Sequence, residues 1–112
     1  MPNTDRIRQL NDELRTTFKG GKIAITPGVM ALGDLPTILK QLREFSEFDE
    51  RSDPYRDFGA FHYEGSSHIG GKGPLLFFQI SHYDNALMFA SPDPTLPEVT
   101  TSVLTILLAE EY

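Results

Sequence analysis

Two runs of aromatic and branched residues, separated by a stretch rich in glycine and serine, constrain the fold of this chain more than any other feature. The runs span Phe58 to Glu64 and Leu75 to Tyr83, and the letters GSSHIGGKGP lie between them. Such residues favour β-strands, and a glycine-rich interval between two such runs is typical of a hairpin. The sequence therefore predicts two antiparallel strands joined by a long loop at residues 65–74.

Two further segments are predicted to be strands. The short run KIAIT at residues 22–26 is rich in branched residues and is followed by the Pro27-Gly28 turn. After the hairpin, Asp84 and Asn85 supply a turn, and Ala86 to Ala90 predicts a strand that continues a meander. We therefore expect a sheet of four strands that is mainly antiparallel.

The first half of the chain also predicts two helices. In residues 5–18 apolar side chains recur at spacings of three and four, which gives one buried stripe, and Thr4 is available as the N-cap. The second helix is expected to begin at the cap residue Asp34 and to continue to about Phe48, with Pro36 in its first turn.

The C-terminal segment predicts a third helix. Thr95 and Glu98 stand in the T-x-x-E spacing of a capping box, and apolar residues continue nearly to Tyr112. The resulting order is α-β-α-β-β-β-α. It indicates a single α+β domain over residues 1–112, with two layers in which the sheet packs on the helices.

Acidic residues outnumber basic ones by 16 to 10, so the net charge is -6. This balance repels a phosphate backbone and disfavours direct nucleic-acid binding. Six carboxylates fall within residues 44–57, which we call the acidic segment: Glu44, Glu47, Asp49, Glu50, Asp53 and Asp57. This segment is either a solvated surface or a carboxylate-rich mimic of nucleic-acid phosphates that occupies a basic groove on a partner protein, with Phe45, Phe48 and Tyr55 as apolar anchors.

The chain has no cysteine and no run near the roughly 20 apolar residues that a membrane helix needs. Its first residues, MPNTDRIRQLNDE, are polar and do not resemble a signal segment. We therefore expect a cytoplasmic protein without a membrane or cofactor partner.

Several short motifs resemble known catalytic motifs but lack the neighbouring residues that the chemistry requires. The triplet DFG at residues 57–59 has no kinase glycine loop or strand lysine, GGKG has no following Ser or Thr, and no serine lies in G-x-S-x-G. An acid–base cluster of Asp53, Asp57 and Glu64 with His62 is a weaker interpretation than a solvated loop. No catalytic residue is assigned.

His62 and His82 offer an alternative function. They lie in adjacent predicted strands and are expected to face each other across the hairpin, with Glu64 or Asp84 nearby. Imidazole and carboxylate groups together are a common metal-ligand set. The alternative is therefore a small metal-dependent enzyme with His62 and His82 as ligands.

Four stretches resemble a family of small alphaproteobacterial proteins of unknown function that are found on plasmids, phages and other mobile elements. They are RIRQLNDELRTTFKGG at 6–21, TPGVMAL at 26–32, DFGAF at 57–61 and SPDPTLPEVTTSVLTILLAEEY at 91–112. The resemblance implies no catalytic residues. It implies a context in which small proteins inhibit host defences, as anti-CRISPR and anti-restriction proteins do.

The function that these observations favour is a non-enzymatic inhibitor that binds a host protein, such as a nucleic-acid-handling defence complex, through the acidic segment. A homodimer formed by an exposed strand remains a third interpretation.

Overall fold

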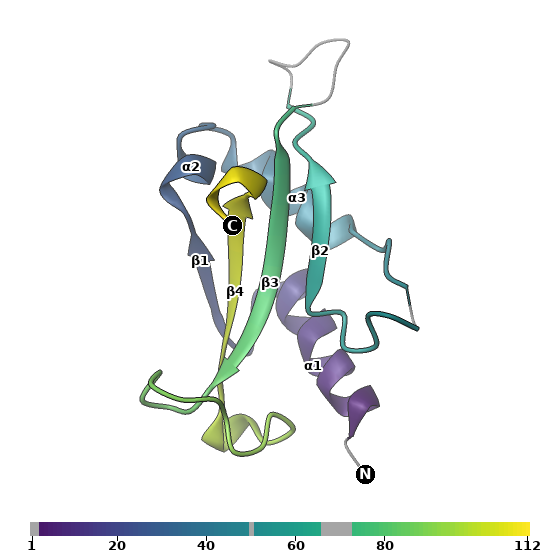
Figure 1. The fold of residues 1–112 in the computed structure, drawn as a ribbon, viewed down its shortest axis with the longest axis vertical. Helices are drawn as coiled ribbons and strands as arrows, with labels where there is room; N and C mark the ends of the chain where they lie inside the picture. The colour runs from purple at the N-terminus through teal and green to yellow at the C-terminus, as the bar shows by residue number, and fades with distance from the viewer. Residues whose placement is uncertain (1–2, 50, 66–72) are drawn as a thin grey trace.

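A four-stranded sheet lies against two helices in the computed structural model, which describes residues 3–49, 51–65 and 73–112 (Figure 1). The strands are β1 (Lys22–Ile25), β2 (Phe58–His62), β3 (Leu75–Tyr83) and β4 (Thr101–Leu108), and their spatial order is β1-β4-β3-β2. The β2–β3 and β3–β4 pairs are antiparallel, whereas β1 is parallel to β4. The predicted α+β class with a mainly antiparallel sheet of four strands is confirmed. Glu50 and residues 66–72 of the predicted hairpin loop lie outside the described residues.

The two longer helices, α1 (Thr4–Thr17) and α3 (Leu35–Glu44), lie behind the sheet in Figure 1, and a single turn, α2 (Pro27–Met30), follows β1. The cap of α1 is Asn3, whose side chain accepts from the N–H of Arg6 at 3.2 Å, so the helix starts one residue earlier than a Thr4 cap implies. The α3 helix ends at Glu44, short of the predicted Phe48, because Phe45 is extended. No helix among the described residues combines the length and apolar character needed to cross a bilayer.

The core lies between the helices and one face of the sheet. Leu14 of α1 and Ile38 and Leu42 of α3 pack against buried side chains of the two central strands, Leu76, Phe78, Ile80, Leu104 and Ile106. Gly59 of the DFG triplet permits this packing: a Cβ at this position would lie 2.3 Å from Cε2 of Phe78. Within the triplet, Gly59 therefore allows β2 to pack closely against the core.

The predicted C-terminal helix is wrong. The segment forms a 3₁₀ turn at Pro97–Val99, then β4, then a second 3₁₀ turn at Ala109–Glu111. The Thr95 hydroxyl, expected to cap a helix, donates instead to the Asp93 carboxylate at 2.6 Å. Because β4 lies between β1 and β3 and carries core residues, its apolar run lacks the alternation of a half-buried strand.

The predicted strand at Ala86–Ala90 is also wrong, because these residues form a turn with only an isolated bridge between Tyr83 and Ala90. The Asp84 carboxylate accepts from the N–H of Met88 at 3.0 Å and so closes the turn. Met88 and Phe89 are 71% and 69% exposed. The fourth strand is supplied by the C-terminal segment instead.

Candidate protein-binding surface

The acidic segment begins at the last residue of α3 and crosses to the start of β2, and its described residues 45–49 and 51–57 form no regular helix or strand. Two of its aromatic rings turn inward. Phe45 and Phe48 meet edge to face with centroids 4.9 Å apart, and both rings pack against Phe78 of the core. Burial of these rings fixes the segment against the protein and leaves its polar residues outside.

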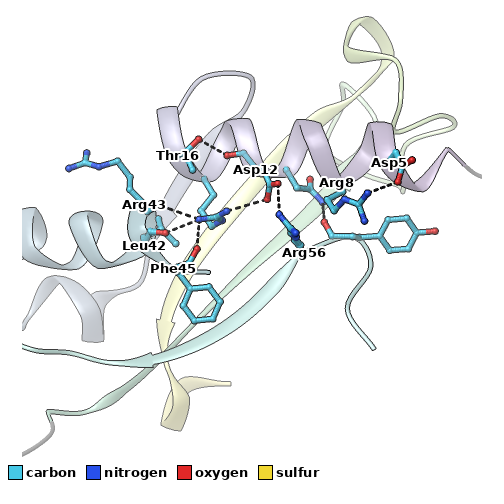
Figure 2. Close-up of polar contacts among 11 residues, drawn as sticks. Asp5, Arg8, Asp12, Thr16, Leu42, Arg43, Phe45 and Arg56 are labelled. Carbon is cyan, nitrogen blue, oxygen red and sulfur yellow. Dashed lines mark hydrogen bonds and ion pairs between the residues drawn. The ribbon is translucent and has the colours of Figure 1, made fainter. Parts of the chain in front are cut away.

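Arg15 of α1 anchors the beginning of the segment. This side chain is 5% exposed, and its Nη1 donates to the carbonyl oxygens of Leu42, Arg43 and Phe45 at 3.3, 3.4 and 2.9 Å. These acceptors, labelled in Figure 2, include the last carbonyls of α3, which have no partner within the helix. Arg15 is therefore buried although it is a charged residue outside the apolar stripe expected for residues 5–18.

Asp12 links the anchor to the far end of the segment. One carboxylate oxygen accepts from Nη2 of Arg15 at 3.2 Å, and the other accepts from Nη1 of Arg56 at 3.0 Å (Figure 2). The guanidinium groups of Arg15 and Arg56 also lie over the Phe48 ring, at 5.2 and 5.5 Å from its centroid. Asn11, 1% exposed, donates to the carbonyl of Tyr55 at 3.0 Å.

The sequence interpretation missed these anchors of the candidate surface. A signal was present, because Asn11, Leu14, Arg15 and Phe18 share one face of α1 at spacings of three and four. Two polar residues on an apolar face indicate buried polar contacts. Nothing in the sequence indicated that their partners were backbone carbonyls of the acidic segment.

The predicted binding residues fall into three groups. Glu44, Glu47 and Asp49 are exposed, Asp53 and Asp57 are half-buried, and Glu50 is outside the described residues. Phe48, predicted to be an apolar anchor, is half-buried and packs against Phe78 of the core. Tyr55 is half-buried. Three of the predicted carboxylates are therefore fully exposed, whereas the aromatic residues Phe48 and Tyr55 are half-buried.

Asp53 and Asp57 lie close enough to influence each other. Burial, and then the negative charge of Asp57, raises the pKa of Asp53. Asp49 behaves oppositely, because the N–H of Arg51 stabilises its carboxylate and lowers its pKa. The segment thus holds one closely spaced carboxylate pair, Asp53 and Asp57, together with the exposed carboxylates Glu44, Glu47 and Asp49.

Two depressions of about 480 and 530 Å³ follow the side of β2 that faces away from β3. Both are lined by Phe45, Glu47 and Ala60, so they adjoin each other. The first adds Glu44, Glu64, Gln41 and His62, and the second adds Asp49, Asp53 and Asp57. We call the two together the acidic groove. All five described carboxylates of the predicted surface line it.

The expected pairing of His62 with His82 is wrong. His62 lies opposite Leu75 at one end of β3, whereas His82 lies seven residues further along β3, opposite Ser102 of β4. At about 3.3 Å per residue this separates the histidines by roughly 23 Å. His62 Nδ1 bonds to the Gly73 carbonyl at 2.9 Å, and His82 Nδ1 bonds to the Ser102 hydroxyl at 2.8 Å.

Glu64 lines the same depression as His62, and the carboxylate of Asp84 closes the turn after β3. Asp57 approaches His82 instead of His62: burial lowers the pKa of His82, and the negative charge of Asp57 partly offsets that effect. Within the described ranges, no three His, Asp or Glu side chains are grouped to hold a metal ion.

Comparison with known proteins supplies one match. The family described as Protein of unknown function (DUF3768) matches residues 25–111, which include α3, the acidic segment and most of the sheet. No curated protein and no solved structure matches the chain. The α1 helix, with its anchors Asn11 and Arg15, lies outside the matched range.

Proposed function

The chain belongs to the DUF3768 family, whose description assigns no function, and from that premise we propose that it is a non-enzymatic acidic protein that binds and inhibits a host protein. The observation that carries the proposal is the gathering of Glu44, Glu47, Asp49, Asp53 and Asp57 along one groove. The partner class we propose is a nucleic-acid-handling defence complex of the kind that anti-CRISPR or anti-restriction proteins inhibit.

The charges in the groove are available to a partner. Among the described residues, ion pairs join Arg8 with Asp5 and both Arg15 and Arg56 with Asp12, and none of these pairs involves the five groove carboxylates. Carboxylates held on a rigid surface attract a basic partner, which raises the association rate and selects against acidic partners. A partner site that normally binds nucleic-acid phosphates is positively charged and therefore complements these carboxylates.

The test is capture of partners from host lysate on immobilised protein. The variant carries Glu44→Lys, Glu47→Lys and Asp49→Lys, three exposed positions of the groove. The matched control carries Glu13→Lys, Glu98→Lys and Glu110→Lys, which are exposed positions outside the groove. Both variants change the net charge equally, so they separate a located surface from overall charge.

We expect the control to retain the captured partner and the groove variant to lose it, while thermal unfolding shows that both remain folded. Capture should also weaken as salt is raised, since exposed charges are screened within about 10 Å at 0.1 M ionic strength. Equal capture by the groove variant and by the unmodified protein would refute the proposal.

A further inference from the structure

The outer side of β2 is a free strand edge. β2 is the last strand in the sheet order, and the chain between α3 and β2 lies on this same side in Figure 1. Ile80 donates its N–H to the Asp57 carbonyl at 2.8 Å, and Tyr63 donates to the Pro74 carbonyl at 3.0 Å, so odd-numbered residues face β3. In an antiparallel ladder the intervening residues turn their N–H and C=O groups outward. Phe58, Ala60 and His62 are these residues.

One end of this edge is already completed by a side chain. Gln41 of α3 donates its Nε2 to the His62 carbonyl at 2.8 Å, and its Oε1 accepts from the N–H of Glu64 at 3.1 Å. A side-chain amide thus makes the two bonds that a peptide group of a neighbouring strand would make. Further along, the outward groups of Phe58 and Ala60 bond to no other residue of the described chain. The end of the edge at His62 and Glu64 is therefore already paired with Gln41, whereas the part at Phe58 and Ala60 has no backbone partner among the described residues.

We propose that this edge receives an extended cationic segment of the partner protein as a fifth strand. The inference rests on the proposed function, because the strand would lie along the acidic groove. Addition of a strand to a free edge uses backbone hydrogen bonds for affinity and alternate side chains for specificity. The acidic groove supplies carboxylates, among them Glu47, on the helix side of this edge.

The two faces of the sheet at β2 determine which residue types should alternate along the added strand. On the helix side, Lys or Arg side chains of the added strand would meet the groove carboxylates. On the opposite side no helix of the described residues covers β2 (Figure 1), and the rings of Phe58, Phe77 and Tyr112 cluster with centroids 5.1 to 6.3 Å apart. Successive side chains of a strand point to opposite faces. The matching segment therefore alternates basic and apolar residues.

Charge argues against a second copy of this chain as the occupant. A symmetry-related β2 would bring its own Glu47, Asp53 and Asp57 to the groove, and like charges across an interface oppose association. The net charge of -6 adds to this repulsion. A cationic segment experiences the opposite effect on the same surface.

The test uses a synthetic peptide of alternating Lys and Val, with two controls. The first alternates Lys and Pro, which keeps the positive charge but cannot form a strand ladder, and the second alternates Glu and Val. Binding is measured by calorimetry. Amide hydrogen exchange of the protein is followed at Ala60 on this edge, with Ala24 of β1, at the other edge of the sheet, as the internal reference.

We expect the Lys–Val peptide to bind at least about tenfold more tightly than either control and to slow exchange at Ala60 by about tenfold or more, without a change at Ala24. Failure of the Lys–Val peptide to bind, equal binding of Lys–Pro, or unchanged exchange at Ala60 would overturn strand addition. Loss of lysate capture by the groove variant together with unchanged exchange at Ala60 would leave the proposed function standing and refute this inference alone.

Discussion

Replacement of Arg15 by Met tests whether the acidic segment is held in place by α1. The variant keeps the buried stem of the side chain but removes the guanidinium that bonds to three carbonyls. A hydrogen bond to a charged group contributes about 1.5 to 3 kcal/mol. We assign about 2 kcal/mol to the 2.9 Å bond with Phe45 and about 1 kcal/mol to the two longer bonds together. The free energy of unfolding should therefore fall by about 3 kcal/mol.

Chemical denaturation monitored by circular dichroism measures this change directly, and the melting temperature should fall by roughly 12 °C for a domain of this size. Arg6→Met is the matched control on the same helix, since within the described part of the chain the Arg6 guanidinium makes only an exposed bond to Gln9. Its cost should stay within about 0.5 kcal/mol. Hydrogen exchange should also accelerate across the acidic segment in Arg15→Met. A loss of stability no larger than that of Arg6→Met would refute the anchoring role.

Three further predictions follow from packing and titration. Phe78→Ala should lower the free energy of unfolding by about 3 to 5 kcal/mol, whereas Phe89→Ala, at a ring that is 69% exposed, should change it by at most about 0.5 kcal/mol in the same denaturation assay. Gly59→Ala should cost about 1 to 3 kcal/mol because its Cβ would overlap the Phe78 ring, and a stability equal to that of the unmodified protein would contradict the close packing. Burial lowers the pKa of His82 in the folded state, so below about pH 6.5 the unfolded chain binds more protons and stability should decrease as the pH falls. Denaturation at several pH values should show a smaller dependence in His82→Gln, and an unchanged dependence would count against burial of this imidazole.

The two strands of the hairpin, β2 and β3, could be predicted from the sequence because their residue types and the glycine-rich interval between them both indicate a hairpin. The C-terminal strand could not, since two local signals pointed elsewhere. Thr95 and Glu98 have capping-box spacing but belong to turns, and the apolar run of β4 is buried in the centre of the sheet. In β4 the alternation is lost because Leu107 is buried as well as Leu104 and Ile106, which point to the opposite face. The β-branched residues of TSVLTILL were the remaining signal for a strand.

The candidate surface was predictable only in its charge. Composition located the carboxylates of the acidic segment, but it could not show that Phe48 turns into the core or that Asp57 lies near His82. The proximity of Asp57 to His82 depends on the sheet register, which also places His62 and His82 at opposite ends of β3. The free edge of β2 likewise follows from the strand order, to which the C-terminal segment, predicted as a helix, contributes the strand β4.

Carboxylates beside a free strand edge have two effects that reinforce each other. Charged groups keep an exposed edge from pairing with other copies of the same chain, and here they also favour a basic partner. Fully solvated charges such as Glu47 would be enough to keep the edge from pairing with other copies of the chain. Asp53 is instead half-buried next to Asp57, and its raised pKa means that folding opposes its charged form above the ordinary aspartate pKa. The chain retains this unfavourable arrangement and holds the surrounding segment through Arg15, Asn11 and Asp12. Positioned carboxylates with a stability cost are expected of a surface that recognises a partner, since solubility requires charge but no particular geometry.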